Sequence, residues 1–291
     1  MTTESPAVRE PATGPLTTRD SFPGRDRLRG RETLPGRATD LIAAEWIKLS
    51  ATRSTWLIVG LGLLGSIGST LLSNNSTVQK WDGWEPAERA AFDPLAASFS
   101  GFALLQLALT AVGALAMSRE YSSGLIRTTF TAVPARRAVL AAKAATVGGL
   151  AAGIGLTVSL ATFTVSQAVF AQKHFGLSLT APGAVRAILA STLHLAGVAL
   201  VGLALAALLR HGAGAVTACF GLLFLAPVFL QSNSGWMLRV HQSLMDSAVR
   251  HLTVGLVERH GPSTPAAWAV LLITPLVLLT VAAAVVDRRD V

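Results

Sequence analysis

The chain has 291 residues and a net charge of +8, with 51% hydrophobic and only 14% charged residues. Long stretches carry no charge at all, a pattern typical of a polytopic membrane protein rather than of soluble domains. The cations are spread over loops and a tail instead of forming one basic face, which argues against nucleic acid as a partner. The single cysteine, Cys219, excludes a disulfide framework and a cysteine-based zinc site.

The first 38 residues form a segment rich in Pro, Arg, Thr and Gly. No apolar core of a secretory signal occurs in it. Because such a composition cannot bury enough apolar surface to offset the entropy of ordering, we expect residues 1–38 to be a disordered tail. The remaining residues, 39–291, are expected to form one transmembrane domain.

Residues 41–49, L-I-A-A-E-W-I-K-L, are predicted to form a short amphipathic helix before the first membrane span. Ile42, Trp46 and Leu49 recur at helical spacing on one face, whereas Glu45 and Lys48 lie elsewhere. This pattern favours a helix that lies in the membrane interface. The alternative is a cytoplasmic continuation of the first spanning helix.

Six apolar runs are long enough to cross a bilayer, so we expect an all-α membrane protein with six transmembrane helices. A polar loop at 74–98, with Trp81 and Trp84 suited to a membrane interface, separates the first two spans. The spans are predicted at 56–72, 99–117, 144–169, 187–209, 215–230 and 267–286.

The segment 231–265 is too apolar for a plain loop and too charged to span the membrane. Trp236, Met237, Val240, Leu244 and Met245 give it an apolar helical face. We interpret it as one or two amphipathic helices that lie in the outer interface or dip into the membrane as a re-entrant hairpin.

The distribution of Lys and Arg predicts how the chain is oriented in the membrane. Most of the 24 basic residues fall on the side that holds both termini and the loop between spans two and three. The positive-inside rule therefore places both termini in the cytoplasm.

That loop, residues 117–143, carries five cations and the acid Glu120 between two spans. Gly124 to Thr131 can form a short amphipathic helix that Pro134 ends. We expect Glu120 to pair with nearby cations such as Arg119 or Arg127, and Gly124 either to cap the exit of the second span or to allow a sharp turn. The helix is well placed for a partner to push it, with Leu125 and Ile126 making apolar contact and Arg127 the charged contact.

Signatures of catalysis and nucleotide binding are missing, including G-x-x-x-x-G-K-[ST], H-E-x-x-H and G-x-S-x-G. The chain is therefore not expected to be an enzyme or to bind a cofactor or metal. No predicted span has a charged residue near its centre, which disfavours an ion-driven transporter. His194, Gln106 and Gln167 are candidates for lining a path, although a neutral, hydrogen-bonded packing role is favoured for all three.

The patterns at 41–56 and 119–143, on either side of a pair of spans, make the chain similar to the membrane-spanning permease subunit of ABC-2-type exporters, in the style of actinobacteria. The resemblance covers residues 40–291. It implies an elbow helix at 41–49, a coupling helix at 120–131 that meets the ATPase, and an outer helical hairpin at 231–265.

The resemblance further implies a separate ABC ATPase subunit that binds the ATP, a second permease chain, and a multi-pass location in the plasma membrane. Glu120, Gly124, Leu125, Ile126 and Arg127 then become the ATPase-coupling residues. The substrate stays open, with a hydrophobic peptide, antibiotic or lipid-like molecule as candidates. A non-transporting membrane anchor or sensor component is the alternative. An importer permease is disfavoured because the E-A-A…G pattern of importers is absent.

Overall fold

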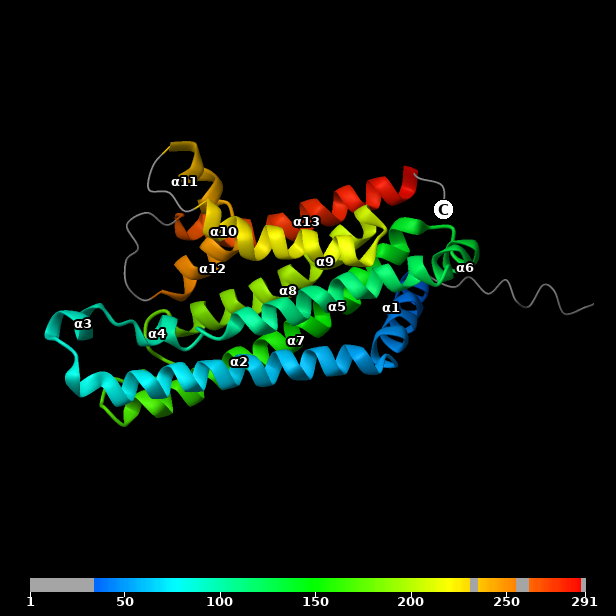
Figure 1. Ribbon diagram of the computed structural model, residues 1–291. Helices are drawn as coiled ribbons and strands as arrows, with labels where there is room; N and C mark the ends of the chain where they lie inside the picture. Colours follow the sequence, from blue (N-terminus) through cyan, green and yellow to red (C-terminus); the bar gives the residue numbers. More distant parts are fainter. Residues whose placement is uncertain (1–33, 231–234, 255–261, 289–291) are drawn as a thin grey trace, which may run out of the picture. The chain divides into compact units, whose positions relative to one another are not determined.

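The computed structural model describes residues 34–230, 235–254 and 262–288, and these residues form helices and no strand (Figure 1). The chain divides into two compact units, 1–37 and 38–291, and the second contains the membrane-spanning helices. The predicted disorder of the tail concerns residues that, up to residue 33, lie outside the described part. The helices are α1 (Leu34–Ser50), α2 (Arg53–Lys80), α3 (Pro86–Ala91), α4 (Pro94–Ala97), α5 (Phe102–Ser122), α6 (Leu125–Ala132), α7 (Arg136–Ala171), α8 (Ala184–Leu209), α9 (Gly212–Phe220), α10 (Ala226–Phe229), α11 (Gly235–Gln242), α12 (Met245–Thr253) and α13 (Thr264–Arg288).

Six helical segments of the described chain are long and apolar enough to cross a membrane, which confirms the predicted fold class. They are Arg53–Gly83, Phe102–Ser122, Arg136–Ala171, Ala184–Leu209, Gly212–Phe229 and Thr264–Arg288.

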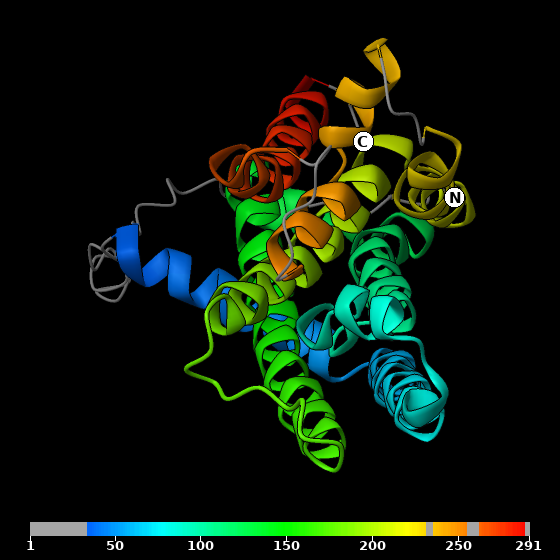
Figure 2. The same cartoon turned by 90° about the vertical axis from the view of Figure 1, so that its left-hand side faces the viewer.

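Helix α8 is the centre of the bundle and packs against α5, α7, α12 and α13 (Figures 1 and 2). Its 26 residues include eight Ala and two Gly, and such small side chains let neighbouring helices approach closely. A Cβ atom at Gly113 of α5 would lie 1.9 Å from the carbonyl oxygen of Ala199, and one at Gly202 would lie 2.3 Å from that of Thr110. The α5–α8 contact therefore depends on two glycines that face the partner backbone.

The first span is longer than predicted. Helix α2 continues to Lys80, eight residues beyond the predicted end at Leu72, so residues 74–80 are not part of a loop. The Asn74 amide donates to the Ser166 hydroxyl at 2.7 Å, and Val78 is buried. The extended end of α2 thus lies along α7, which supplies the partner of the Asn74 amide.

The third span begins earlier than predicted, at Arg136 rather than at 144. Lys143, which the sequence placed in a water-exposed loop, therefore lies in the second turn of α7. The first turn of α7 is fixed to the end of α13, since Arg137 pairs with Asp287 at 2.8 Å and Arg136 donates to the Val286 carbonyl at 3.2 Å.

The fifth span contains a π-helical turn, Gly221–Leu225, directly before Pro227. Proline has no N–H, and its ring clashes with the carbonyl four residues earlier in a regular α-helix. The wider π turn relieves that conflict and keeps the segment helical through Phe229. At about 1.5 Å per residue the 18-residue segment has just enough length for a membrane core.

The segment after span five contains α11 and α12, and residues 231–234 and 255–261 of the predicted hairpin lie outside the described part. Helix α12 packs on α8 and α13. The Arg186 side chain donates to the carbonyls of Leu252 and Val254 at 3.0 and 2.9 Å, which fixes the end of α12 to the start of α8. Trp236 of α11 is exposed.

Aromatic rings gather at the opposite end from α6. The Trp81 and Phe175 rings stack at 4.0 Å, and Trp84, Phe92 and Phe170 join the same cluster. Lys173 pairs with Asp82 beside it. These contacts join the ends of α2 and α7 to α3. The other end of the bundle, which we call the α6 end, holds α6, the start of α7 and the end of α13 (Figure 1).

Candidate functional site

Helix α6 connects α5 to α7 and corresponds to the helix predicted at 120–131 between spans two and three, but it begins at Leu125, because residues 120–122 continue α5. Gly124 precedes it with φ of +72°, a left-handed conformation that glycine adopts without steric cost. The helix ends at Ala132, because Val133 is extended, as expected for a residue before Pro134. Gly124 therefore makes the sharp turn that its sequence position indicated.

The side chains of α6 divide into a buried and an exposed face. Ile126 is only 2% exposed and packs into a cluster that includes Met117 of α5 and Leu203 of α8. Leu125 is 44% exposed, and Arg127 is exposed as well. The expectation that Ile126 contacts a partner is therefore wrong, since Ile126 anchors α6 to the bundle. Leu125 and Arg127 remain available.

A groove of about 470 Å³ follows the start of α6 and is polar in character. The Arg210 guanidinium lies 5.6 Å from the centre of the Tyr121 ring, a cation–π contact. The lining residues are Tyr121, Ser122, Ser123, Gly124, Ile126, Arg127 and Arg210.

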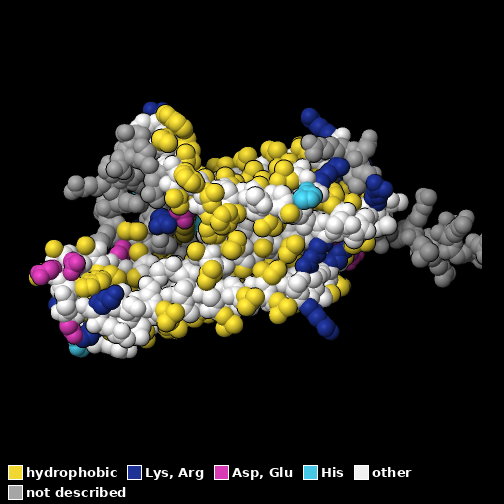
Figure 3. Space-filling view, viewed as in Figure 1, with side chains coloured by type: hydrophobic (Ala, Val, Ile, Leu, Met, Phe, Trp, Pro, Cys, Tyr) yellow, Lys and Arg dark blue, Asp and Glu magenta, His cyan; other side chains and the backbone are white. Residues whose placement is uncertain are grey.

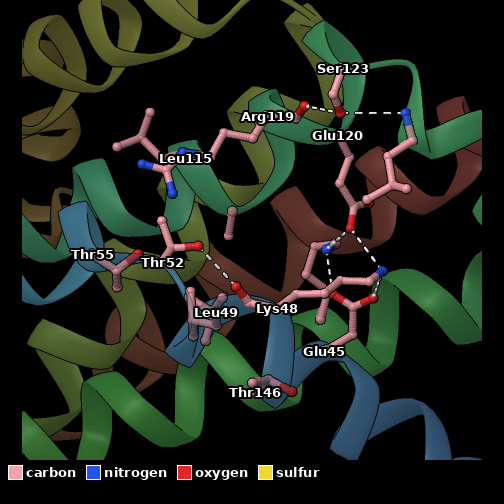
Figure 4. Close-up of a pocket in the computed structure, with 14 residues that line it drawn as sticks. Glu45, Lys48, Leu49, Thr52, Thr55, Leu115, Arg119, Glu120, Ser123 and Thr146 are labelled. Carbon is pink, nitrogen blue, oxygen red and sulfur yellow. Dashed lines mark hydrogen bonds and ion pairs between the residues drawn. The ribbon is translucent and has the colours of Figure 1, made fainter.

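Four charged side chains meet beneath α6, and we call them the charge cluster: Glu45 and Lys48 of α1, Glu120 of α5 and Lys143 of α7 (Figure 4). The Glu120 Oε1 atom accepts from Lys48 at 3.0 Å and from Lys143 at 2.8 Å. Glu45 accepts from Lys48 at 2.7 Å through Oε1 and from Lys143 through Oε2. Each carboxylate thus binds both ammonium groups.

These contacts correct the predicted pairing of Glu120. Its partners are Lys48 and Lys143, not Arg119 or Arg127. The Arg119 guanidinium instead donates to the Ser54 hydroxyl of α2 at 2.5 Å. Arg119 and Arg127 are closer to Glu120 in the sequence, but the packing of α1 and α7 against the buried side of α5 brings Lys48 and Lys143 to this carboxylate instead.

Three members of the cluster are buried, with exposed fractions of 5% for Glu45, 5% for Glu120 and 3% for Lys143. Removing charges from water is costly, so a buried ion must find opposite charge and hydrogen bonds in the protein. The cluster balances two positive with two negative charges, and one of its carboxylate oxygens, Glu120 Oε2, is buried without a hydrogen-bond partner among the described residues. Lys48 is partly exposed; burial lowers its pKa, but the hydrogen bonds to Glu45 and Glu120 outweigh this effect and raise the pKa above 10.5.

A pocket of about 270 Å³ opens beside the charge cluster, between α1, α5 and α7 (Figure 4). It is lined by the cluster itself, by hydroxyls from Thr52, Thr55, Ser123 and Thr146, and by Arg119 and Leu125. Leu125 joins the pocket to the exposed face of α6.

His194 and Gln106, two of the predicted path residues, form a pair between α8 and α5. The His194 Nε2 atom lies 3.2 Å from the Gln106 Oε1 atom, and both side chains are buried. The favoured prediction of a packing histidine hydrogen-bonded to a neighbouring helix agrees with this contact.

Gln167, the third, lies apart from that pair. Its amide nitrogen donates to the Ser98 hydroxyl at 2.8 Å, and its Oε1 atom accepts from the Leu177 amide at 2.7 Å. Gln167 thus fastens the turn after α7 to the residues after α4, on the side of the bundle away from α6.

Sequence patterns did not single out Glu45, Lys48 or Lys143 as site residues. One signal was present, because Glu45 and Lys48 stand three residues apart on the otherwise apolar helix that precedes the first span. Only the packing of α1 against α5 and α7 shows that these charges face inward. Among the described residues no group of three or more His, Cys, Asp or Glu side chains is placed to hold a metal ion.

Comparison with known proteins identifies the family. A search of curated proteins finds no match. A family model described as "ABC-2 family transporter protein" matches residues 41–226, which is more than half of the chain and includes α6 and the whole charge cluster. This match, together with the six helical segments that are long and apolar enough to cross a membrane, shows that the chain belongs to the ABC-2 transporter family.

Proposed function

We propose that the chain is the permease subunit of an ATP-driven exporter and that a separate ABC ATPase docks on α6. Membership of the ABC-2 family supports a permease that works with such an ATPase. The observation that carries the proposal is the two-sided character of α6. Ile126 is fixed in the bundle, whereas Leu125 and Arg127 face outward at the point where a partner could push.

The α6 end faces the cytoplasm in this proposal. Lys and Arg side chains gather around this end in Figure 3. Asp and Glu side chains gather around the opposite end, which holds α3 and which we call the α3 end. The positive-inside rule assigns such a basic end to the cytoplasmic side. An ATPase supplied with ATP by the cytoplasm then meets α6, with both termini on the same side of the plasma membrane.

In this proposal the chain catalyses no reaction itself, and ATP hydrolysis by the separate ATPase drives transport. The ATPase binds and hydrolyses ATP, and its closure displaces α6. Because Ile126 lies in the same hydrophobic cluster as Met117 of α5 and Leu203 of α8, a push on α6 would be transmitted to these central helices. A second permease chain completes the path, and the apolar character of the spans supports a hydrophobic peptide, antibiotic or lipid-like substrate.

The experiment uses outward-facing substitutions on α6. Leu125→Asp and Arg127→Glu should leave membrane levels of the chain unchanged, lower the amount of ATPase that co-purifies with it, and abolish export. The deficit of Arg127→Glu should vary with salt concentration, since screening weakens interactions between exposed charges. Arg239→Glu, which reverses an exposed charge on α11, is the matched control and should behave as wild type.

A non-transporting anchor or sensor needs no ATPase. Wild-type chain that purifies without ATPase, or a Leu125→Asp/Arg127→Glu double variant that retains ATPase and export, would contradict the proposal.

A further inference from the structure

Helix α1 is held to the bundle by very few side chains. Of residues 38–50, only Glu45 and Leu49 are buried, and Lys48 is partly buried beside them. Ile42, Trp46 and Ile47 of the same helix are 40%, 44% and 65% exposed. The contact between α1 and the rest of the unit therefore combines the charge cluster with Leu49, which belongs to the same hydrophobic cluster as Val59 and Val147.

The cluster also brackets α6 in the sequence. Glu120 lies in the last turn of α5, just before α6, and Lys143 lies in the second turn of α7, just after it. Both bind Glu45 or Lys48 of α1. Helix α1 is thus tied to the two segments that lead into and out of α6.

We propose that the charge cluster is a mechanical tie that makes α1 move together with α6. This inference rests on the proposed function, because it supposes that a partner displaces α6. In the cluster each lysine bridges a carboxylate on α1 and the carboxylate on α5. Separating α1 from α5 and α7 would break two of the four ion pairs, Lys48–Glu120 and Lys143–Glu45, and would leave each charge with a single partner in a largely buried site, which costs more than moving the helices as one body.

The tie continues from α1 into the first span. The Thr52 hydroxyl donates to the Lys48 carbonyl at 3.0 Å, and the Trp56 indole donates to the Ser50 carbonyl at 2.8 Å. These bonds fix the corner between α1 and α2. Displacement of α6 would thereby reach α2 through the cluster and α1, in addition to the direct route through Ile126 to α5 and α8. Glu45, Lys48 and Lys143 are positioning residues in this scheme.

Paired spin labels measure the tie directly. Cysteines at Ile47 of α1 and Thr128 of α6, both exposed, are labelled in a Cys219→Ser background in lipid nanodiscs, and the distance distribution is measured. The wild-type cluster should give one narrow distribution. Lys143→Met, which removes one of the two shared ammonium groups and the buried Lys143–Glu45 pair between α7 and α1, should broaden it at least twofold, and Lys143→Arg should restore it because the charge returns.

Two controls separate loss of the tie from loss of the fold. A label pair at Leu189 of α8 and Leu276 of α13, exposed sites within the bundle, should stay narrow in every variant. Lys173→Met, which removes an ion pair with Asp82 at the α3 end, should leave the Ile47–Thr128 distribution unchanged. An Ile47–Thr128 distribution that stays narrow in Lys143→Met overturns the proposal.

A second measurement, with the ATPase bound, distinguishes the tie from the proposed function. Trapping the complex with ADP and vanadate should change the Thr128–Leu276 distance and leave the Ile47–Thr128 distance constant. Equal changes in both distances would overturn the tie while leaving coupling through α6 intact. No change at Thr128–Leu276 would instead contradict displacement of α6, and with it the transmission from α6 to α1.

Discussion

At the scale of single residues, burial determines which polar groups contribute to the stability of the fold. Lys143 and Glu120 are charged and buried in the same cluster, and His194 is paired with Gln106 in the apolar interior. A buried polar group that loses its partner costs free energy, whereas an exposed one is satisfied by water. A substitution at one of these positions should therefore lower the stability of the fold mainly by leaving its buried partner without a hydrogen bond or ion pair.

His194→Leu leaves the Gln106 Oε1 atom without its histidine partner. We expect this variant to lower the free energy of unfolding by about 1 kcal/mol, the scale of hydrogen bonds between membrane helices. The His194→Leu/Gln106→Leu double variant should lose less than the sum of the two single variants. Thermal unfolding in detergent measures the cycle, and strictly additive effects would mean that the contact contributes nothing. Export should stay within a few-fold of wild type, since neither residue is assigned to transport.

Lys48 gives a pH dependence with a defined sign. Although burial lowers its pKa, the hydrogen bonds to Glu45 and Glu120 raise it above 10.5. Its contribution to stability is therefore complete below pH 10.5 and is lost as the pH rises through the higher folded-state pKa. Lys48→Gln should flatten this alkaline loss, whereas Lys80→Gln, at the exposed end of α2, should keep it. Unfolding midpoints measured between pH 8 and roughly pH 12 test this, and identical curves for wild type and Lys48→Gln would refute it.

At the scale of helices, α5 and α8 make an unusually close backbone contact. Gly113→Ala places a methyl group against the Ala199 carbonyl, which should cost about 1–3 kcal/mol and push the helices apart. Gly60→Ala is the matched control in α2, where a Cβ meets nothing within 4 Å. That control should be neutral or slightly stabilising, because alanine favours helix more than glycine does. Thermal unfolding in detergent compares the two variants, and equal stability would show that the backbones are not in contact.

Helix α6 shows how a short amphipathic pattern can identify an element but not its faces. Gly124 and Pro134 marked both ends, because left-handed turns and proline have local causes. The orientation of Ile126 depends on Met117 and Leu203, which no local pattern reveals. Ile126→Asp should therefore reduce the amount of folded protein in the membrane, whereas Leu125→Asp should not. Size-exclusion profiles of the two variants in detergent compare them, and a well-folded Ile126→Asp would contradict this assignment.

At the scale of the whole transmembrane unit, hydropathy was sufficient to predict six spanning helices. It could not predict their lengths, because Asn74 and Lys143 are polar residues that continue helices only where a neighbouring helix satisfies them. The charge cluster escaped prediction for the same reason, since α1, α5 and α7 contribute to it from separate parts of the chain. Local sequence predicts which segments form helices, and long-range packing decides which charges those helices bury.

The same contrast explains why the family could be predicted and the substrate could not. The patterns at 41–56 and 119–143 belong to the end of the bundle where α1 and α6 lie, and they fall within the matched region. Apolar span surfaces, by comparison, are required of any membrane bundle and carry little information about a particular substrate.

The central claim is that α6 is where a separate ATPase meets this chain, and site-specific photo-cross-linking tests it most directly. A photoreactive residue is placed at Leu125, with Leu61 of α2, 71% exposed on a spanning segment, as the control. Illumination of native membranes should join Leu125, but not Leu61, to a protein that carries a nucleotide-binding ABC domain, as identified by mass spectrometry. A Leu125 position that captures no such protein, while the chain is folded and active in export, would contradict the claim.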